Sequence, residues 1–416
     1  MSNTKTIYVY FADQTGTSAQ ALLGILSAHY SRGKELFSFD FDKEWLRNNP
    51  VRSLDPDLQL YAGPQFTAKP NFGLFMDSAP DHWGRMLMRR REAVRARQAG
   101  IKPRALMESD YLLGVYDETR MGALRFKIEP DGKFQNDDSA MAAPPWARLR
   151  ELEEASRHLE TDSDDTESGK WLAMLLAPGS SLGGARPKAS VTDSKGNLWI
   201  AKFPAHDDTS NTAAWEYATM QMARDAGLNT PQARLEKLSE FGSTFLVKRF
   251  DRNGARRIHF ASAMTLLGKS DGADAQSGSS YLDLAEFIMQ YGARPKEDLQ
   301  ELWTRIVFSI AVSNTDDHLR NHGFLLTDSG WNLSPVYDVN PNPQGLGLSL
   351  NITDADNSLV FSLAMEIAPM FRLKTSEAGD IASRVRSAVS TWRTYASHAG
   401  ISPAEQNQMQ NAFRLE

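Results

Sequence analysis

The stretch SNTDDHLRNHGF, residues 313–324, limits what this chain can fold into more than any other part of the sequence. It holds two acids, two histidines, an arginine and two asparagines, and it directly follows the apolar run LWTRIVFSIAV at 302–312. An apolar run of this kind predicts a buried helix. The sequence therefore predicts a candidate active site in a polar loop at the end of that helix.

The segment after this polar stretch predicts a β-hairpin. Residues 323–327 (GFLLT) and 331–338 (WNLSPVYD) flank a turn centred near Ser329. Asn321 lies eight positions before Ser329 and Asp338 lies nine positions after it, so both should return to the open end of the hairpin. An amide oxygen and a carboxylate placed together there can share a hard cation.

The spacing of Asp316 and Asn321 indicates a chemistry for this end of the hairpin. The two residues are five positions apart, which is the D-x-x-x-x-N spacing of a kinase catalytic loop. Asp316 as a base, with Asn321 and Asp338 as magnesium ligands, supplies the groups that phosphoryl transfer requires. The stretch therefore favours a phosphotransferase.

A zinc site is the rival interpretation of the same stretch. His318 and His322 are four positions apart and would share one face of a helix. No glutamate occupies the H-E-x-x-H position, and Asn321–Gly323 disfavour a helix. A plain solvated loop is a third interpretation, but it does not explain why Asp338 returns beside Asn321.

A second hairpin is predicted with a glycine-rich loop at its open end. The expected strands are residues 187–193 and 198–203, and their pairing brings Lys202 roughly opposite Ala189, near Gly183–Gly184. Backbone N–H groups of such a loop can cradle phosphates, and a lysine can reach them as a point charge. A plain glycine turn beside a surface lysine is the alternative, because the stretch is not a G-x-x-x-x-G-K-[ST] loop.

Two features downstream extend this interpretation. The helix expected from Thr212 places Glu216 within reach of a strand lysine, provided that the helix packs on the same sheet. The apolar run TFLVKRFDR at 244–252 breaks at Lys248–Arg249–Phe250, and its backbone could serve as an adenine hinge. Most strands of this kind are simply part of the core.

Composition excludes several classes of protein. The chain has 416 residues, which predicts two or three domains. A net charge of −6 argues against a dedicated nucleic-acid binder. The absence of cysteine excludes disulfides and thiolate chemistry and suits a reducing cytoplasm. We expect neither a signal peptide nor a membrane span, and so a cytoplasmic protein without membrane partners.

The order of patterns along the chain predicts its organisation. Short extended runs at 6–12 and 123–129 come early, polar linkers surround a helix near 146–159, and helices dominate from 281 onward. A polar tract at 268–280 predicts a long loop. Strands followed by helices favour an α+β, two-lobed body.

Five motifs in this order resemble the HipA family of serine/threonine kinases, the toxins of type II toxin–antitoxin modules. They are SSLGGARPKA, WIAKFP, FLVKRFDR, NTDDHLRNHGF and LSPVYDVNP. The stretches FSFDFDKEWL and FGLFMDSAPDHWGRMLMRR are similar to the small N-terminal subdomain of that family. The resemblance covers nearly the whole chain. It implies a protein-kinase-like fold with a small N-terminal α/β subdomain and a mainly helical C-terminal lobe.

This resemblance also implies domain bounds. The N-terminal subdomain would comprise 1–135, a linker with a helix 136–170, the kinase N-lobe with the phosphate loop 171–250, and the helical C-lobe with the catalytic loop 251–416.

Carried over to this sequence, the resemblance implies ATP and Mg²⁺ and a role for each matching residue. Asp316 would be the catalytic base, and Asn321 and Asp338 would hold the metal. The nucleotide would contact the phosphate loop of Gly183, Gly184, Ala185, Arg186, Pro187 and Lys188, then Lys202, the backbone of Lys248 and Phe250, and His318, Asn321, Tyr337 and Asp338. Ser181 matches the autophosphorylation serine, and Ser180 offers a second hydroxyl beside it.

The function expected from these features is transfer of the γ-phosphoryl group of ATP to a protein serine or threonine. The resemblance implies an aminoacyl-tRNA synthetase as substrate, inhibition of translation, self-limitation by autophosphorylation, and a role in persistence. Its implied partners are a helix-turn-helix HipB-like antitoxin and, mainly through that antitoxin, DNA. A small-molecule phosphotransferase and a non-catalytic DNA-bound co-repressor are the alternatives.

Overall fold

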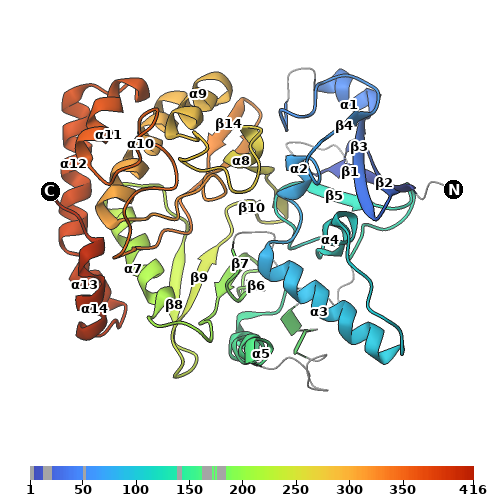
Figure 1. Ribbon diagram of the computed structural model, residues 1–416, viewed down its shortest axis with the longest axis horizontal. Coiled ribbons are helices and arrows are strands. Elements are labelled where there is room, and N and C mark those ends of the chain that lie inside the picture. Colours follow the sequence, from blue (N-terminus) through green and yellow to red (C-terminus); the bar gives the residue numbers. More distant parts are fainter. Residues whose placement is uncertain are drawn as a thin grey trace. The chain divides into compact units, whose positions relative to one another are not determined.

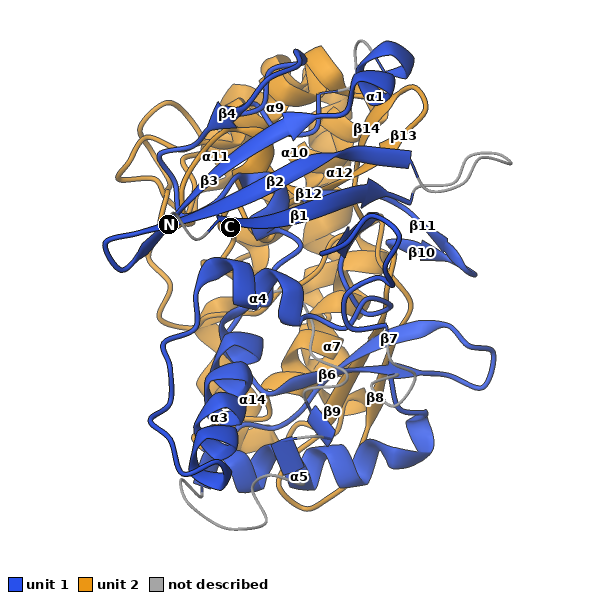
Figure 2. Ribbon diagram, turned by 90° about the vertical axis from the view of Figure 1, so that its right-hand side faces the viewer, with its two compact units in different colours: residues 1–206, 251–261 blue, residues 207–250, 262–416 orange. Residues whose placement is uncertain are grey.

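The computed structural model describes residues 4–12, 21–49, 53–137, 143–161, 171–172, 174–175 and 184–416. The chain divides into two compact units, which Figure 2 colours separately. Unit 1 comprises Met1–His206 and Asp251–Ala261, and unit 2 comprises Asp207–Phe250 and Ser262–Glu416. Both units contain helices and strands, so the α+β fold class predicted from the sequence is confirmed.

Unit 1 is built on a five-stranded sheet. Its order is β4 (Gln65–Phe66), β3 (Lys34–Phe41), β2 (Ala21–Ser31), β1 (Thr4–Phe11) and β5 (Leu124–Lys127), and all neighbouring strands are antiparallel. Alternate side chains of β1 face the core, where Ile7 and Val9 are fully buried. The sequence predicted β1 and β5 but not β2 and β3, which follow β1 in the chain.

Helices and two antiparallel strand pairs complete unit 1. The helical segments are α1 (Lys43–Asn48), α2 (Gly73–Met76), α3 (His82–Gln98), α4 (Glu108–Gly114), the 3₁₀ turn η2 (Trp146–Arg148) and α5 (Leu149–Thr161). One pair is β6 (Lys188–Thr192) with β7 (Leu198–Lys202). The other is the short pair β10 (Arg252–Asn253) and β11 (Arg256–Arg257), in the second segment of unit 1. Strand β12 (Phe260–Ser262) ends at the boundary of the two units.

Unit 2 is mainly helical (Figure 1). Its helical segments are α7 (Thr212–Asp225), α8 (Ala263–Leu266), α9 (Tyr281–Tyr291), α10 (Pro295–Val312), α11 (Phe361–Ile367), η3 (Ala368–Phe371), α12 (Thr375–Ser390), α13 (Trp392–His398), α14 (Pro403–Met409) and η4 (Gln410–Ala412). Its strands form two antiparallel pairs: β8 (Ala233–Glu236) with β9 (Thr244–Lys248), and β13 (Gly323–Thr327) with β14 (Gly330–Leu333).

Helix α10 is the centre of unit 2 and corresponds to the apolar run that the sequence singled out. It packs against α9, α11 and α12, and Leu302, Trp303, Ile306 and Ile310 on it are fully buried. Burial of each such side chain contributes about 1.5–3 kcal/mol to folding. Because α10 is held on several sides, the residues that follow its last turn start from a well-fixed position.

The predicted loop at 268–280 has no regular helix or strand, as expected, but it is anchored. The N–H of Ala275 donates to the carbonyl of Ser349 at 2.7 Å, and Asn351 Nδ2 donates to the carbonyl of Ala275 at 2.9 Å.

The two compact units do not coincide with the domain bounds expected from the sequence. Those bounds describe a proposed functional division and remain a proposal.

Among the described residues, no helix is both long enough and apolar enough to cross a membrane.

Candidate functional site

The polar stretch begins where α10 ends. Ser313 adopts the left-handed conformation with φ 49°, and the N–H of Asn314 still donates to the carbonyl of Ser309 at 2.9 Å. A left-handed residue that is not glycine costs energy and persists only where its surroundings hold it. Here it turns the chain out of the helix axis and into the loop 314–322.

Two backbone contacts at the start of α8 hold the far side of this loop. The N–H of Ala263 donates to the carbonyl of His322 at 2.8 Å, and the N–H of Met264 donates to the carbonyl of Leu319 at 3.2 Å. The first N–H groups of a helix have no partner within the helix, so they are available to bind the loop. The loop is therefore fixed at both of its ends.

Asn321 closes the loop on Asp316. Its N–H donates to the carbonyl of His318 at 2.8 Å, and its side-chain Nδ2 donates to the carbonyl of Asp316, also at 2.8 Å. Asn321 is only 3% exposed, yet its Oδ1 atom has no hydrogen-bond partner among the residues that the structure describes. A buried acceptor left open in this way is costly unless a ligand uses it.

In contrast to the buried Asn321, Asp316 has 85% of its side chain exposed. The chain around it removes part of its hydration, and this together with the negative charges of Asp338 and Asp317 raises the pKa of the Asp316 carboxyl, while His318 opposes the shift. Because Asp338 acts on Asp316 electrostatically, the prediction that Asp338 returns towards the loop agrees with the structure.

The segment around Asp338 is bound to the loop by its neighbours. Asp338 itself has φ 58°, in the left-handed region. Two residues later the N–H of Asn340 donates to Asn314 Oδ1 at 3.1 Å, and Asn342 Nδ2 donates to Thr315 Oγ1 at 2.8 Å. The strand β14 ends earlier than the sequence predicted, at Leu333, so this return is made by irregular chain rather than by the hairpin ladder.

The two histidines of the rival zinc interpretation have different neighbours. His318 Nε2 lies 4.0 Å from Asp316 Oδ1 and is part-exposed, whereas His322 Nε2 lies 2.9 Å from the buried Asp317 Oδ1. Among the described residues, no three His, Asp or Glu side chains gather as a metal site. Mg²⁺ does not need such a group, because it keeps several waters and binds through only one or two carboxylates.

Other predicted nucleotide contacts in unit 2 lie near this loop. Tyr337 donates its hydroxyl to the carbonyl of Arg320 at 2.7 Å, and the rings of Tyr337 and Phe250 are 5.7 Å apart. Lys248 ends β9, and its N–H donates to the carbonyl of Gln232 at 2.8 Å. Tyr337 and Phe250 are thus brought together, and their role as nucleotide contacts stays a prediction.

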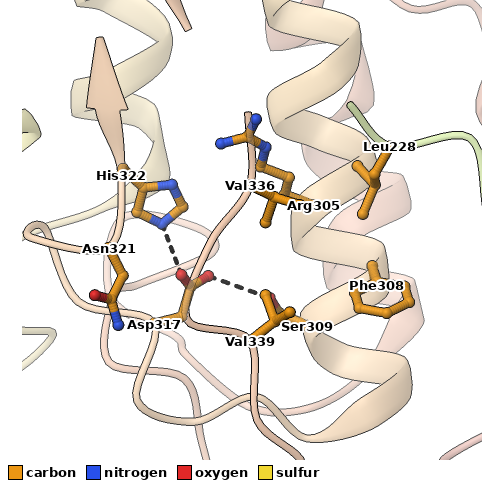
Figure 3. A pocket seen from close by; sticks show the side chains of 9 residues that line it. All are labelled: Leu228, Arg305, Phe308, Ser309, Asp317, Asn321, His322, Val336 and Val339. Atoms are coloured by element: carbon orange, nitrogen blue, oxygen red, sulfur yellow. Dashed lines mark hydrogen bonds and ion pairs between the residues drawn. The ribbon is translucent and has the colours of Figure 1, made fainter. Parts of the chain in front are cut away.

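A buried polar cluster that the sequence did not reveal lies directly beneath the loop. Asp317 accepts hydrogen bonds from Tyr281 and Ser309 and pairs with His322, and Figure 3 shows the last two contacts beside a narrow cavity. The one signal in the sequence was the adjacent pair Asp316–Asp317, because two neighbouring acids in one loop seldom share the same environment. Tyr281 and Ser309 carry no local signal, because they come from α9 and α10.

In unit 1, the lysine at the start of the hairpin, Lys188, has a structural role. Lys188 is 1% exposed, and its ammonium donates to Asp81 Oδ2 at 2.9 Å and to the carbonyl of Gly184 at 3.2 Å. Burial raises the pKa of the Asp81 carboxyl, although Lys188 and the N–H of Gly84 act against that shift. Lys188, predicted as part of a phosphate loop, therefore holds the loop to the start of α3.

The register of this hairpin differs by one residue from the prediction. Lys202 pairs with Lys188, and Ala189 pairs with Ala201. The reason is that Asp193 joins the turn, since its Oδ1 accepts from the N–H groups of Lys195 and Asn197. A five-residue turn replaces the expected four-residue turn and shifts the partner of Lys202.

The remaining predicted residues of this region are only partly described. Gly184 has φ +87°, a conformation that favours glycine, and the chain continues through Ala185, Arg186 and Pro187 into β6. Gly183, Ser181 and Ser180 lie outside the described residues, so the roles expected of them remain predictions.

Comparison with known proteins identifies the family to which this site belongs. The model of the HipA-like C-terminal domain matches residues 180–392, which is just over half of the chain. A solved chain from the Shewanella oneidensis MR-1 toxin–antitoxin complex of HipA, HipB and operator DNA is similar in fold, with a TM-score of 0.65. The sequences are 16% identical, and the match covers 98% of this chain and 96% of that chain.

Two curated proteins are similar in sequence. A Haemophilus influenzae protein named "Putative kinase" is 29% identical over 191 residues, covering 40% of this chain and 54% of the relative. The Sinorhizobium fredii protein "Putative kinase Y4dM" is 27% identical over 168 residues, covering 35% of this chain and 37% of the relative. The chain thus aligns with about half or less of each of these relatives.

Proposed function

Because this chain belongs to the HipA family of kinases, we propose that it is an ATP-dependent serine/threonine protein kinase that acts as a HipA-like toxin. The observation that supports this best is the loop in which an exposed Asp316 stands beside the open acceptor of Asn321 and the charge of Asp338. An exposed acid with a raised pKa beside an open buried acceptor is typical of a functional site.

Asp316 is the catalytic base in this proposal. Its exposed carboxyl can reach the hydroxyl of a protein substrate, and its raised pKa improves its ability to take a proton. Asn321 holds the backbone of Asp316 through Nδ2, which fixes the position from which the base reaches the acceptor. Asp316 therefore orients the serine or threonine and receives its proton.

Asn321 and Asp338 fit a hard cation such as Mg²⁺. The Oδ1 atom of Asn321 is buried and open among the described residues, and amide and carboxylate oxygens are the ligands that Mg²⁺ prefers. The cation would neutralise charge on the phosphates of ATP. Water and the phosphates would complete the ligand set.

The nucleotide contacts in this proposal follow from the family resemblance. Gly183–Lys188 would form the phosphate loop, and Lys202 would contact the phosphates. In unit 2, the backbone of Lys248 and Phe250 would bind the adenine, and His318 and Tyr337 would lie beside the nucleotide. The contact between the Phe250 and Tyr337 rings supports the second part, because a paired aromatic surface is suited to a planar base.

Autophosphorylation of Ser181, or of Ser180 beside it, would limit the activity. A phosphate adds roughly −1.5 to −2 charges at neutral pH, which would oppose the binding of the phosphates of ATP nearby. Mass spectrometry of the protein made in cells should find phosphate on Ser181 or Ser180. A Ser181→Asp variant that binds ATP as tightly as the unmodified chain would contradict this regulation.

The partners belong to the proposal as well. HipB and operator DNA accompany the similar Shewanella chain, which supports a HipB-like helix-turn-helix antitoxin for this one and DNA contact mainly through it. We propose a protein substrate in the cytoplasm, with an aminoacyl-tRNA synthetase as the substrate class and inhibition of translation as the result.

The test is phosphoryl transfer from γ-labelled ATP by the full chain with Mg²⁺. Asp316→Asn should lower the rate by about 10²- to 10⁴-fold, which is the usual contribution of a positioned base. Its unfolding temperature should not change, because the side chain is exposed. Asp380→Asn, an exposed acid on α12, is the matched control and should keep the wild-type rate.

Other outcomes separate the alternatives. A wild-type rate in Asp316→Asn would show that Asp316 is not the base. Transfer to small hydroxyl compounds but to no protein would favour a small-molecule phosphotransferase. Repression of a promoter together with an antitoxin, without any transfer, would favour a DNA-bound co-repressor.

A further inference from the structure

The loop contains two adjacent aspartates that point to opposite environments. The side chain of Asp316 is 85% exposed, whereas that of Asp317 is 6% exposed. Neighbouring residues of the same type could exchange places if the backbone between them rotated. Something must therefore select which carboxylate faces the solvent and which one is buried.

Asp317 is held by donors from three parts of unit 2. Tyr281 on α9 donates its hydroxyl to Asp317 Oδ2 at 2.5 Å, and Ser309 on α10 donates to the same oxygen at 3.2 Å. His322, just before β13, places Nε2 2.9 Å from Asp317 Oδ1. Both oxygens of the carboxylate thus have partners, and none of these partners can bind Asp316 without unpairing Asp317.

These contacts favour the charged form of Asp317 despite its depth. Burial alone would raise the pKa of Asp317, but the interaction with His322 and the hydrogen bonds from Tyr281 and Ser309 outweigh it, so the pKa is lowered. Burial and the nearby carboxylate raise the pKa of Tyr281 well above its usual value, so Tyr281 remains a donor. A buried carboxylate paired in this way does not leave its site without a large cost.

Packing alone does not explain the position of Asp317. A narrow cavity lies beside it, lined by Arg305, Phe308, Asn321 and His322 among others (Figure 3). The edge of the Tyr281 ring faces His322 at a centroid distance of 5.7 Å and an interplanar angle of 88°, which orients the imidazole. On the cavity side, hydrogen bonds rather than close-packed neighbours determine where Asp317 lies.

We infer that Asp317 is a positioning residue which, through Tyr281, Ser309 and His322, keeps Asp316 turned outward and Asn321 in place for phosphoryl transfer. The inference rests on the proposed function, because it assigns a role for that reaction. Asn321 and Asp316 are already linked through the loop backbone, so a small rotation at Asp317 would displace both. Catalysis is sensitive to a displacement of about 1 Å in a reacting group.

The test is Asp317→Asn in the full chain, assayed by ADP release and by transfer of labelled phosphate. Asparagine has the same shape but lacks the charge, so His322 and the two hydroxyls would no longer hold it in one orientation. We expect kcat to fall by about 10- to 100-fold, as is common when a group that orients an active residue is changed. The KM for ATP should change less than kcat, because Asp317 acts on the nucleotide only through Asn321.

A double-mutant cycle identifies the network. Tyr281→Phe keeps the ring beside His322 but removes the short bond to Asp317, so it should lower kcat by less than Asp317→Asn. The double variant should be no slower than Asp317→Asn alone, because both changes break the same contact. Additive losses would show that the two residues act separately and would overturn the inference.

A second phenol–carboxylate pair in the same unit supplies matched controls. Tyr395 on α13 donates to Asp225 on α7, in an exposed place. Asp225→Asn and Tyr395→Phe should leave kcat unchanged. If they lower kcat as much as the Asp317 and Tyr281 variants, the effect is general to the fold and the inference fails.

Hydrogen exchange gives a readout that does not depend on activity. Asp317→Asn should speed exchange of the amides in 314–322 while the rest of α10 keeps its protection. Unchanged exchange with an unchanged kcat would overturn the positioning role. A wild-type chain that transfers no phosphate would contradict the proposed function itself, whereas an active wild type with an equally active Asp317→Asn would contradict only this inference.

Discussion

Unit 1 and unit 2 each contain a cluster of charged groups that the sequence marked as functional, and the two clusters differ in how completely the protein satisfies them. In unit 1, Lys188 is buried, pairs with Asp81 and donates to the carbonyl of Gly184. In unit 2, Asp316 is exposed, and the buried Oδ1 of Asn321 is open among the described residues.

This difference separates structure from chemistry. A buried ion pair whose donors and acceptors are met mainly determines geometry, and removing one partner is costly. A buried acceptor without a partner beside an exposed acid lowers stability and is retained where a ligand uses it. The comparison predicts that changes in the first cluster alter stability and that changes in the second alter activity.

The largest effect is expected for Lys188→Met. Methionine fills a similar volume but leaves the carboxylate of Asp81 buried without its cation. Breaking such a pair costs about 3–5 kcal/mol of the free energy of unfolding, which denaturant unfolding followed by circular dichroism should measure.

The double variant Asp81→Asn/Lys188→Met is the control for this change. It should recover part of the loss, because asparagine carries no charge and can still cap α3 through the N–H of Gly84. If Lys188→Met is as stable as the wild type, the ion pair is not what holds this loop.

Asn321→Ala should produce a smaller effect than Lys188→Met, and the effect should be on activity rather than on stability. It removes both the open oxygen and the hydrogen bond to the carbonyl of Asp316. A contact of this strength corresponds to about 1.5–3 kcal/mol, or roughly 10- to 100-fold in the rate of phosphoryl transfer. The variant should also need more Mg²⁺ for half its maximal rate.

Asn351→Ala is the matched control for Asn321→Ala. Asn351 is also buried and also donates to one carbonyl, that of Ala275, but it lies outside the loop. It should lose some stability and keep its rate. Equal rates in the two variants would remove the distinction between the clusters.

The smallest effect is expected for Lys202→Ala, which tests the comparison within unit 1. Lys202 is the cross-strand partner of Lys188, and like charges opposite one another are unfavourable unless one is neutralised. Asp81 neutralises Lys188, and Lys202 is the lysine proposed to contact phosphate. Calorimetry should show ATP bound roughly tenfold more weakly, about 1.5 kcal/mol.

Lys195→Ala, in the exposed turn of the same hairpin, is the control and should bind ATP like the wild type. Unchanged affinity in Lys202→Ala would place the phosphate contact elsewhere.

Local patterns predicted the elements of this chain well where a turn or an apolar run decided them. The hairpin after Asn321 and the helix before Asn314 were both predicted, because a tight turn and an apolar period act over short distances. The strands β2 and β3 were missed, and the partner of Lys202 was wrong by one residue. Asp193 acts as a turn residue only through side-chain bonds that the strand pattern does not show.

The sequence by itself determined the residue types at the candidate site and their spacing along one loop. The distance from Asp316 to Asn321 is short enough that a single loop must bring them together, so no knowledge of packing was needed. Only the tertiary structure decided that Asp317 is buried while Asp316 is exposed, and that Lys188 pairs with Asp81. Those choices depend on α9, α10 and α3, whose side chains reach these residues from far along the chain. Burial and partner geometry, not residue type, determine which of two like residues carries charge at the surface.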